Sequence, residues 1–360
     1  MPGKSRRVTP LALRPTFAVV PAVAVDILLF IIGVIVAALT LSDVFGTVVV
    51  PGGSRALLRV THRVVFILLP VWKYARGRRR GLSSMFAPLA LVLSFAIWMG
   101  LLTFAFGLMA YALRHDFQRP ITSIGDAFYL VGSSLATVGL SESHPHGPAR
   151  WVILASGFCG LGVMTMAVTY LLEVQNSITR RDTGIIKLNT SAGEPPSALT
   201  LLERFAAIRN KHALGEMLDE SRNWCATVRQ SHASHPSLIY FQSVGTGAGW
   251  PAALGAVLDL SWVFELCVDD ERLYGSAVLL GAEGTRMARD LAGLINLDPD
   301  VPSFDEQDIR DVAERLAASG YDVRRDLDIA AIVSRRSAYQ ACVNALAEHL
   351  GRPATVLIRR

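Results

Sequence analysis

Residues 121–142 combine side-chain and backbone groups that suit the binding of a cation. Ser123 and Asp126 have the spacing of a capping box, so a short helix is expected to begin there and to end near Leu135. The C-terminal end of a helix carries the negative end of its dipole and favours a cation. The residues just beyond it are Thr137-Val138-Gly139-Leu140, which offer a hydroxyl and a series of backbone carbonyls. The chemistry that this segment predicts is therefore cation binding by oxygen atoms.

Two long runs without charged residues flank this segment and must position it. Met85–Leu113 precedes it and Trp151–Leu172 follows it, and neither contains Asp, Glu, Lys or Arg. A hydrocarbon core about 30 Å thick needs about 20 apolar residues of helix, so each run is long enough to cross a membrane. A helix of three or four turns between them must stop inside the membrane. The backbone that follows it is tolerated there only if it lines a cavity or is buried by protein.

From Asp126 to Glu142 the sequence resembles the pore helix and filter of the potassium-channel superfamily, whose two-transmembrane members read close to D-A-L-Y-F-S-V-V-T-L-T-T-V-G-Y-G-D. The resemblance covers Met85 to about Arg181, roughly a quarter of the chain. It implies an outer helix, a pore half-helix, a filter and an inner helix in each subunit, with four subunits around the ion. The gapless alignment has these identical residues: Asp126, Ala127, Tyr129, Leu135, Thr137, Val138 and Gly139.

The same resemblance implies a role for each filter residue. Carbonyl oxygens of Thr137–Leu140, together with the Thr137 hydroxyl, would replace the hydration shell of K⁺. Gly139 would supply backbone angles that a side chain disfavours. Ser141 completes the filter segment, and Glu142 stands at the outer mouth. K⁺ at these carbonyls is the only bound metal expected, and neither a structural metal nor a cofactor is predicted.

Three adjacent positions depart from the family. Leu140 replaces the aromatic residue that braces the filter from behind, Ser141 replaces the second glycine, and Glu142 replaces the aspartate. A non-glycine residue in the left-handed conformation costs about 1–2 kcal/mol, so Ser141 is expected either to strain the outer filter or to let it relax. Selectivity for K⁺ over Na⁺ therefore stays open. A turn with one glycine is also similar to the filters of Trk/Ktr-type potassium transporters, but those repeat four such segments in one chain and this chain has one.

The apolar run after the filter has two further features of interest. Gly157, Gly160 and Gly162 lie near its middle, where the inner helix of the family often has a glycine hinge, and close packing of small residues explains them equally well. Glu173 ends the run. In a tetramer it contributes either to a ring of four carboxylates at the inner mouth or only to the membrane interface.

Charge is distributed unevenly along the 360 residues and indicates the topology. Residues 1–181 contain 17 Lys/Arg and 6 Asp/Glu, whereas residues 182–360 contain 18 and 24. The basic residues of the first half lie at the ends of apolar runs, where cations meet lipid head groups, so nucleic-acid binding is not expected. The most basic loop is Ser54–Arg80, and the positive-inside rule places it in the cytoplasm together with everything after Arg181.

The N-terminal region adds one more membrane segment. Ile27–Val50 is a span interrupted by Asp43, which is interpreted either as a residue at the head-group boundary or as a functional carboxylate. Val64–Trp72 is apolar but too short to cross, and it predicts an interfacial helix, with a re-entrant segment as the alternative. Three spans place the N-terminus outside.

The second half of the chain predicts a helical domain without a catalytic site. The expected order is an N-terminal span and basic interfacial segment (1–84), an ion-channel pore domain (85–181), a Ser/Thr/Gly/Pro-rich linker (182–200) and a cytosolic α-helical domain (201–360). The fold class is therefore all-α. The glycines of 245–249 are spaced by two and do not fit a dinucleotide-binding turn. The four cysteines are far apart, and no arrangement of nucleophile, base or paired carboxylates indicates an enzyme.

The function predicted from these observations is passive K⁺ conduction by a homotetramer in the bacterial inner (plasma) membrane, gated by an unidentified ligand that acts on the cytosolic domain. A weakly selective monovalent cation channel is the alternative within the same architecture. A membrane-anchored sensor or scaffold that conducts nothing is the alternative from another class.

Overall fold

The computed structural model describes residues 22–50, 58–78, 85–140, 143–243, 247–300, 306–353, 355, 357 and 358. These residues form helices joined by short turns, and no strand occurs among them beyond two isolated bridges, Phe117 with Pro145 and Val268 with Val323. The predicted all-α fold class is confirmed. The predictions for Ser141 and Glu142 lie outside the described residues.

Three of the helices have the length and the exposed apolar surface of membrane spans. They are α1 (Ala22–Val48), α4 (Phe86–Ala112) and α6 (Gly147–Ala192). At about 1.5 Å per residue, α1 and α4 are each about 40 Å long and exceed a hydrocarbon core of about 30 Å. Apolar side chains on their surfaces, such as Ile27, Ile35 and Leu89, are more than half exposed. Such surfaces are stable against lipid and not against water.

A fourth helix has the composition of a span but is part of a protein core. It comprises α9 (Gly249–Trp262) and the π-helical turn η3 (Val263–Cys267), and 89% of its apolar window is buried within the protein. A helix that is apolar on all sides belongs either in lipid or in the centre of a bundle, and this one is in the bundle.

The chain divides into two compact units. The first contains the described residues up to Leu41 together with Met99–Val163, and it includes the short helix α5 (Ile124–Leu135). Its helices pack closely at glycines. A Cβ at Gly33 would overlap the Ala105 carbonyl, and a Cβ at Gly107 would overlap the Phe128 ring. Close approach of backbones at small residues is the usual way in which helices associate in membranes.

The second unit contains Ser42–Trp98 and Met164–Arg360 and has one large core. Its central helix α9 is buried at every residue. The remaining elements are α2 (Val60–Arg78), α7 (Ala198–Ala207), η1 (Lys211–Ala213), α8 (Leu214–Ser234), η2 (Pro236–Tyr240), α10 (Glu271–Leu294), α11 (Glu306–Ala318) and α12 (Ile329–Leu350). Helices α8, α9, α10 and α12 make the most extensive contacts with one another. The core is therefore a helical bundle.

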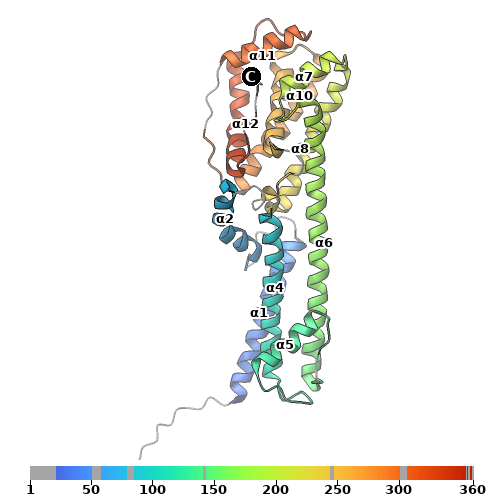
Figure 1. The fold of residues 1–360 in the computed structure, drawn as a ribbon, viewed down its shortest axis with the longest axis vertical. Helices are drawn as coiled ribbons and strands as arrows, with labels where there is room; N and C mark the ends of the chain where they lie inside the picture. Colours follow the sequence, from blue (N-terminus) through green and yellow to red (C-terminus); the bar gives the residue numbers. More distant parts are fainter. Residues whose placement is uncertain are drawn as a thin grey trace, which may run out of the picture. The chain divides into compact units, whose positions relative to one another are not determined.

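The structure corrects the prediction of an irregular linker. Residues 182–192 are helical, and α6 continues without a break to Ala192 (Figure 1). Ile185, Leu188 and Ala192 are buried at a spacing of three to four residues, so this part of α6 packs against the bundle core. Gly184 is needed because a Cβ there would overlap the Trp224 ring, and it is not a mark of a loop.

Asp43 is buried and hydrogen-bonded within the protein. Its Oδ2 accepts from Trp98 Nε1 at 2.8 Å and from the backbone N–H of Val60, the first residue of α2, at 3.2 Å. A carboxylate at the N-terminus of a helix is favoured by the helix dipole. Asp43 therefore joins α1, α4 and α2, a structural role that the sequence did not indicate.

Candidate ion pore

The half-helix α5 begins at the capping box that the sequence predicts. Ser123 is the N-cap, its Oγ accepts from the Asp126 N–H at 3.1 Å, and the Ser123 N–H donates to Asp126 Oδ2 at 3.3 Å. Two N–H groups that the first helical turn leaves without partners are satisfied in this way. The helix ends at Leu135, so the predicted start and end of α5 are confirmed.

Side chains from both neighbouring long helices position α5. Its buried residues, Ala127, Leu130, Val131 and Leu135, recur at helical spacing on one face. On the α4 side, Phe128 packs against Phe104, with ring centroids 5.9 Å apart, and against Gly107. On the α6 side, Ser134 Oγ donates to the Ile153 carbonyl at 3.0 Å. The end of α5 is thus fixed between α4 and α6.

The backbone after α5 folds back so that consecutive N–H groups face the helix end. The N–H of Thr137 donates to the Ser134 carbonyl at 2.9 Å, and that of Val138 to the Ser133 carbonyl at 2.9 Å. The Gly139 N–H reaches the same Ser133 carbonyl at 3.3 Å. The Leu140 N–H donates to Ser133 Oγ at 2.6 Å. All four amides of the segment are therefore held by two adjacent serines.

Left-handed residues at alternate positions produce this arrangement. Thr137 has a φ of +58° and Gly139 a φ of +73°. When left-handed residues alternate with others, successive N–H groups converge on one side and the carbonyls turn to the other. No described residue donates a hydrogen bond to the carbonyls of Thr137–Leu140. As far as the described residues go, these carbonyl oxygens are therefore available to a ligand at the negative end of the α5 dipole.

The sequence anticipated the conformation of Gly139 but not that of Thr137. A left-handed non-glycine residue costs about 1–2 kcal/mol, and hydrogen bonds on both sides of Thr137 must offset this cost. The sequence also did not single out Ser133. The signal that would have found it is the absence of an aromatic residue at Leu140, because a filter at this position would need another group to hold its outer part.

The three glycines of the inner helix have different surroundings within the first unit. A Cβ at Gly160 would overlap the Leu135 backbone, and a Cβ at Gly157 would lie 3.3 Å from Ser134 Oγ. Close packing against α5 therefore accounts for both. Nothing lies within 4 Å of a Cβ at Gly162, and α6 is helical through all three positions. A hinge remains a prediction, and Gly162 is the position where packing gives no other reason for glycine.

Glu173 lies on an exposed part of α6 and lines a cavity of about 910 Å³ between α6 and α8. The cavity is lined by residues of both helices, including Tyr170, Glu173, Asn176, Arg180, Gln230 and His235. Burial lowers the pKa of His235, and the negative charge of Glu173 partly opposes this effect. His235 is consequently neutral at pH 7. The charged groups lining the cavity are Glu173 and Arg180.

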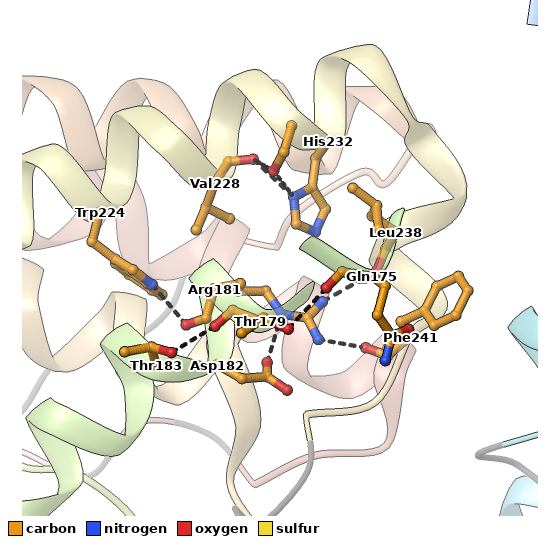
Figure 2. Close-up of polar contacts among 11 residues, drawn as sticks. Gln175, Thr179, Arg181, Asp182, Thr183, Trp224, Val228, His232, Leu238 and Phe241 are labelled. Carbon is orange, nitrogen blue, oxygen red and sulfur yellow. Dashed lines mark hydrogen bonds and ion pairs between the residues drawn. The ribbon is translucent and has the colours of Figure 1, made fainter. Parts of the chain in front are cut away.

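Beyond the cavity, Arg181 attaches α6 to the helical bundle (Figure 2). Its guanidinium group is buried and donates to Asp182 Oδ1 at 3.0 Å, to the Leu238 carbonyl at 3.2 Å and to the Phe241 carbonyl at 3.0 Å. Trp224 Nε1 donates to the Arg181 carbonyl at 2.9 Å. A buried charge is stable only when it is paired and hydrogen-bonded, and these contacts provide both. The rotation of α6 about its axis is thereby fixed relative to α8 and η2.

The described residues contain no group of three or more His, Cys, Asp or Glu that could hold a metal ion. The four cysteines are free thiols, and burial raises the pKa of Cys225 and of Cys267, the latter to about 11. These two thiols are thus protonated at pH 7.

Comparison with known proteins supports this interpretation of the pore. Residues 97–175 match a protein-family model described as ion channel, and the match includes α5, the filter segment and the part of α6 that follows it. Comparison with curated proteins and with solved structures gave no match. With its long apolar helices, the chain is a multi-pass membrane protein and a channel subunit. Its residues 97–175 are an ion-channel domain of the potassium-channel superfamily.

Proposed function

We propose that four copies of this chain form a channel that conducts K⁺ passively, with the carbonyl oxygens of Thr137–Leu140 as its ligands. The observation that supports this proposal is the attachment of four consecutive N–H groups to Ser133 and Ser134. With the N–H groups held on the α5 side, the carbonyls would be directed away from α5, as a filter requires. Selection of K⁺ depends on the number and the field strength of such carbonyls.

A tetramer is proposed because one filter strand can line only one side of an ion. The chain also has apolar side chains around the filter that are exposed in a single copy. Tyr129 is 64% exposed, Val138 60% and Leu140 55%. Neighbouring copies of the same segment would cover these side chains and complete the ring of carbonyls. A closed ring of identical subunits is the common way to build such a symmetric assembly.

The hydrogen bond from Leu140 to Ser133 favours K⁺ selectivity over the weakly selective alternative, because it fixes the outer carbonyls without an aromatic brace. We also propose that the protein lies in the plasma membrane with the helical bundle in the cytoplasm, following the basic content of residues 54–80. Membrane-impermeant thiol reagents applied to intact cells should label a cysteine introduced at Arg119 and should not label one introduced at Leu279. The reverse result would contradict this topology.

Ion flux into liposomes tests the proposed function. The purified protein should form tetramers and pass K⁺ in marked preference to Na⁺. Equal flux of the two ions would establish the weakly selective channel, and a tetramer without flux would establish the scaffold. Neither result is compatible with the proposal.

Gly139→Ala provides the internal test of the filter. A Cβ there meets no other atom within 4 Å, so the substitution acts through the backbone, at about 1–2 kcal/mol per subunit. Flux should be abolished while the tetramer and the helix content remain. Gly100→Ala is the matched control, because it adds the same methyl group to α4 where nothing lies within 4 Å. Normal flux in Gly139→Ala would show that this segment is not the filter.

A further inference from the structure

Helix α2 has apolar side chains on two faces, and only one of them is covered by the protein. Val64 and Trp72 are buried, and Val65, Leu68 and Leu69 pack against the bundle core. The second face is exposed and follows helical spacing over two turns. Its large side chains are Phe66 (69% exposed), Ile67 (70%), Val71 (64%) and Tyr74 (65%). This set is called the α2 stripe below.

Contacts at both ends of α2 place it where the spans leave the hydrocarbon core. At its start, the Val60 N–H is bound to Asp43, which also binds Trp98. Asp43 lies about 26 Å along α1 from Asp26, by the rise of the helix, and Asp26 is paired with Arg114. Polar contacts separated by nearly the thickness of a hydrocarbon core are what its two boundaries would require.

At the other end of α2, Trp72 contacts the first residue of α4 and the bundle. Its ring lies 5.5 Å from that of Phe86, 5.5 Å from that of Tyr240 and 6.0 Å from that of His349. Helix α2 is thus attached to the spans α1 and α4 and also to the helical bundle. A basic segment between the spans and the bundle is expected at the level of the lipid head groups.

Charge indicates which molecule covers the α2 stripe. Residues 54–80 contain eight Lys/Arg and no Asp or Glu. Of these, Arg63 and Lys73 are exposed on α2 itself, Arg63 one turn before Phe66 and Lys73 next to Tyr74. Such cations are attracted to the anionic lipids of the cytoplasmic leaflet. Four copies of so basic a segment would repel one another, which argues against contact between α2 helices of different subunits.

We propose that the α2 stripe is a docking surface for anionic lipid, with Phe66, Ile67, Val71 and Tyr74 among the upper acyl chains and Arg63 and Lys73 at the phosphates. The lipid surface then holds α2, and α2 holds the bundle through Trp72. This inference rests on the membrane orientation given with the proposed function but not on ion conduction. Lipid composition would consequently act on the bundle through α2.

Quenching of a fluorophore by labelled lipids tests the proposal on the full-length protein. A Cys159→Ala background removes the least buried natural thiol. An environment-sensitive fluorophore is then attached at Ile67→Cys, at Val71→Cys or, as a control, at Leu279→Cys, which replaces an exposed apolar residue of α10. Each protein is reconstituted in phosphatidylcholine vesicles with or without phosphatidylglycerol, with brominated acyl chains as the quencher.

The proposal requires quenching at positions 67 and 71, stronger with phosphatidylglycerol, and none at position 279. Arg63→Glu with Lys73→Glu should reduce quenching at position 67 towards the control level and abolish the effect of phosphatidylglycerol. Equal quenching at positions 67 and 279, or disulfide cross-linking between the position-67 cysteines of neighbouring subunits in place of quenching, would overturn it. Quenching in a preparation that passes no ions would leave the lipid surface established and contradict only the proposed function.

Discussion

Replacing Ser133 by alanine is expected to weaken ion selection without unfolding the pore. The substitution removes the Oγ that accepts from the Leu140 N–H at 2.6 Å. The Ser133 carbonyl, which accepts from Val138 and Gly139, belongs to the backbone and is retained. Only the outermost of the four filter attachments is therefore lost. The Leu140 carbonyl becomes free to move, while the inner carbonyls stay in position.

The size of the effect follows from one hydrogen bond per subunit. Such a bond contributes about 0.5–1.5 kcal/mol. Four subunits that act together would therefore lose about 2–6 kcal/mol of the free energy that holds the outer filter in place. If about 1 kcal/mol of this loss appears in the free-energy difference with which the filter distinguishes K⁺ from Na⁺, the ratio of K⁺ to Na⁺ permeability should fall about fivefold. Reversal potentials measured with K⁺ and Na⁺ on opposite sides of a bilayer give this ratio directly.

Two neighbouring variants make the result interpretable. Ser133→Thr keeps the hydroxyl and should retain most of the selectivity. Ser134→Ala removes an equally small group whose Oγ binds the Ile153 carbonyl of α6 and not the filter, so it should lower thermal stability more than selectivity. An unchanged permeability ratio in Ser133→Ala, or an equal fall in Ser134→Ala, would refute the argument that Ser133 holds the outer filter.

Three further predictions concern packing, the buried charge network and pH. Gly160→Ala places a Cβ against the Leu135 backbone, so it should displace α5 and abolish flux in liposomes. Asp259→Asn removes the buried negative charge paired with Arg336 at 3.0 Å and should lower the free energy of unfolding by about 3–5 kcal/mol, measured by thermal or denaturant unfolding. Burial, assisted by the positive charge of Arg181, lowers the pKa of His232 to about 3. The unfolded chain takes up a proton near pH 6.5 while the folded bundle stays neutral, so stability is complete above about pH 6.5 and falls by about 1.4 kcal/mol for each pH unit below it, down to about pH 3.

Each of these predictions has a matched control. Gly100→Ala adds the same methyl group to α4 where nothing lies within 4 Å and should retain flux. Arg272→Ala breaks a pair whose arginine side chain is 85% exposed and should lower the free energy of unfolding far less than Asp259→Asn does. His232→Gln should flatten the pH dependence of the melting temperature between about pH 4 and 6.5. In this range the unfolded chain binds a proton at His232 and the folded bundle does not. Loss of flux in Gly100→Ala, equal destabilisation in the two ion-pair variants, or a pH profile unchanged by His232→Gln would count against the respective reasoning.

The start of α5 could be predicted from the sequence because a capping box is a local pattern. Ser123 and Asp126 satisfy each other across three residues, whatever surrounds them. The attachment of residues 138–140 to Ser133 could not be predicted in the same way, since it depends on the backbone reversing direction at Thr137, whose positive φ is uncommon for a residue with a side chain.

The error over residues 182–192 has a similar cause. Ser, Thr and Gly lower helix propensity, but propensity is overridden when a helix buries one face. Ile185 and Leu188 are buried, and Thr183 and Thr190 donate their hydroxyls to carbonyls one turn earlier. Composition alone showed the polar residues and not the packed face. The buried role of Asp43 was missed because its partner Trp98 is distant in sequence.

The use of backbone oxygens in the proposed filter has a consequence for how its sequence can change over evolution. A ligand supplied by a side chain is lost when that residue mutates, whereas a carbonyl oxygen is present whichever residue bears it. Substitution at Val138 or Leu140 would therefore alter the stiffness of the oxygen row and leave its chemistry unchanged. Drift can proceed at these positions as long as the conformations of Thr137 and Gly139 and the acceptors on Ser133 are maintained. The non-aromatic residue at position 140 is compatible with such drift, and selection would act mainly on the groups that hold the backbone.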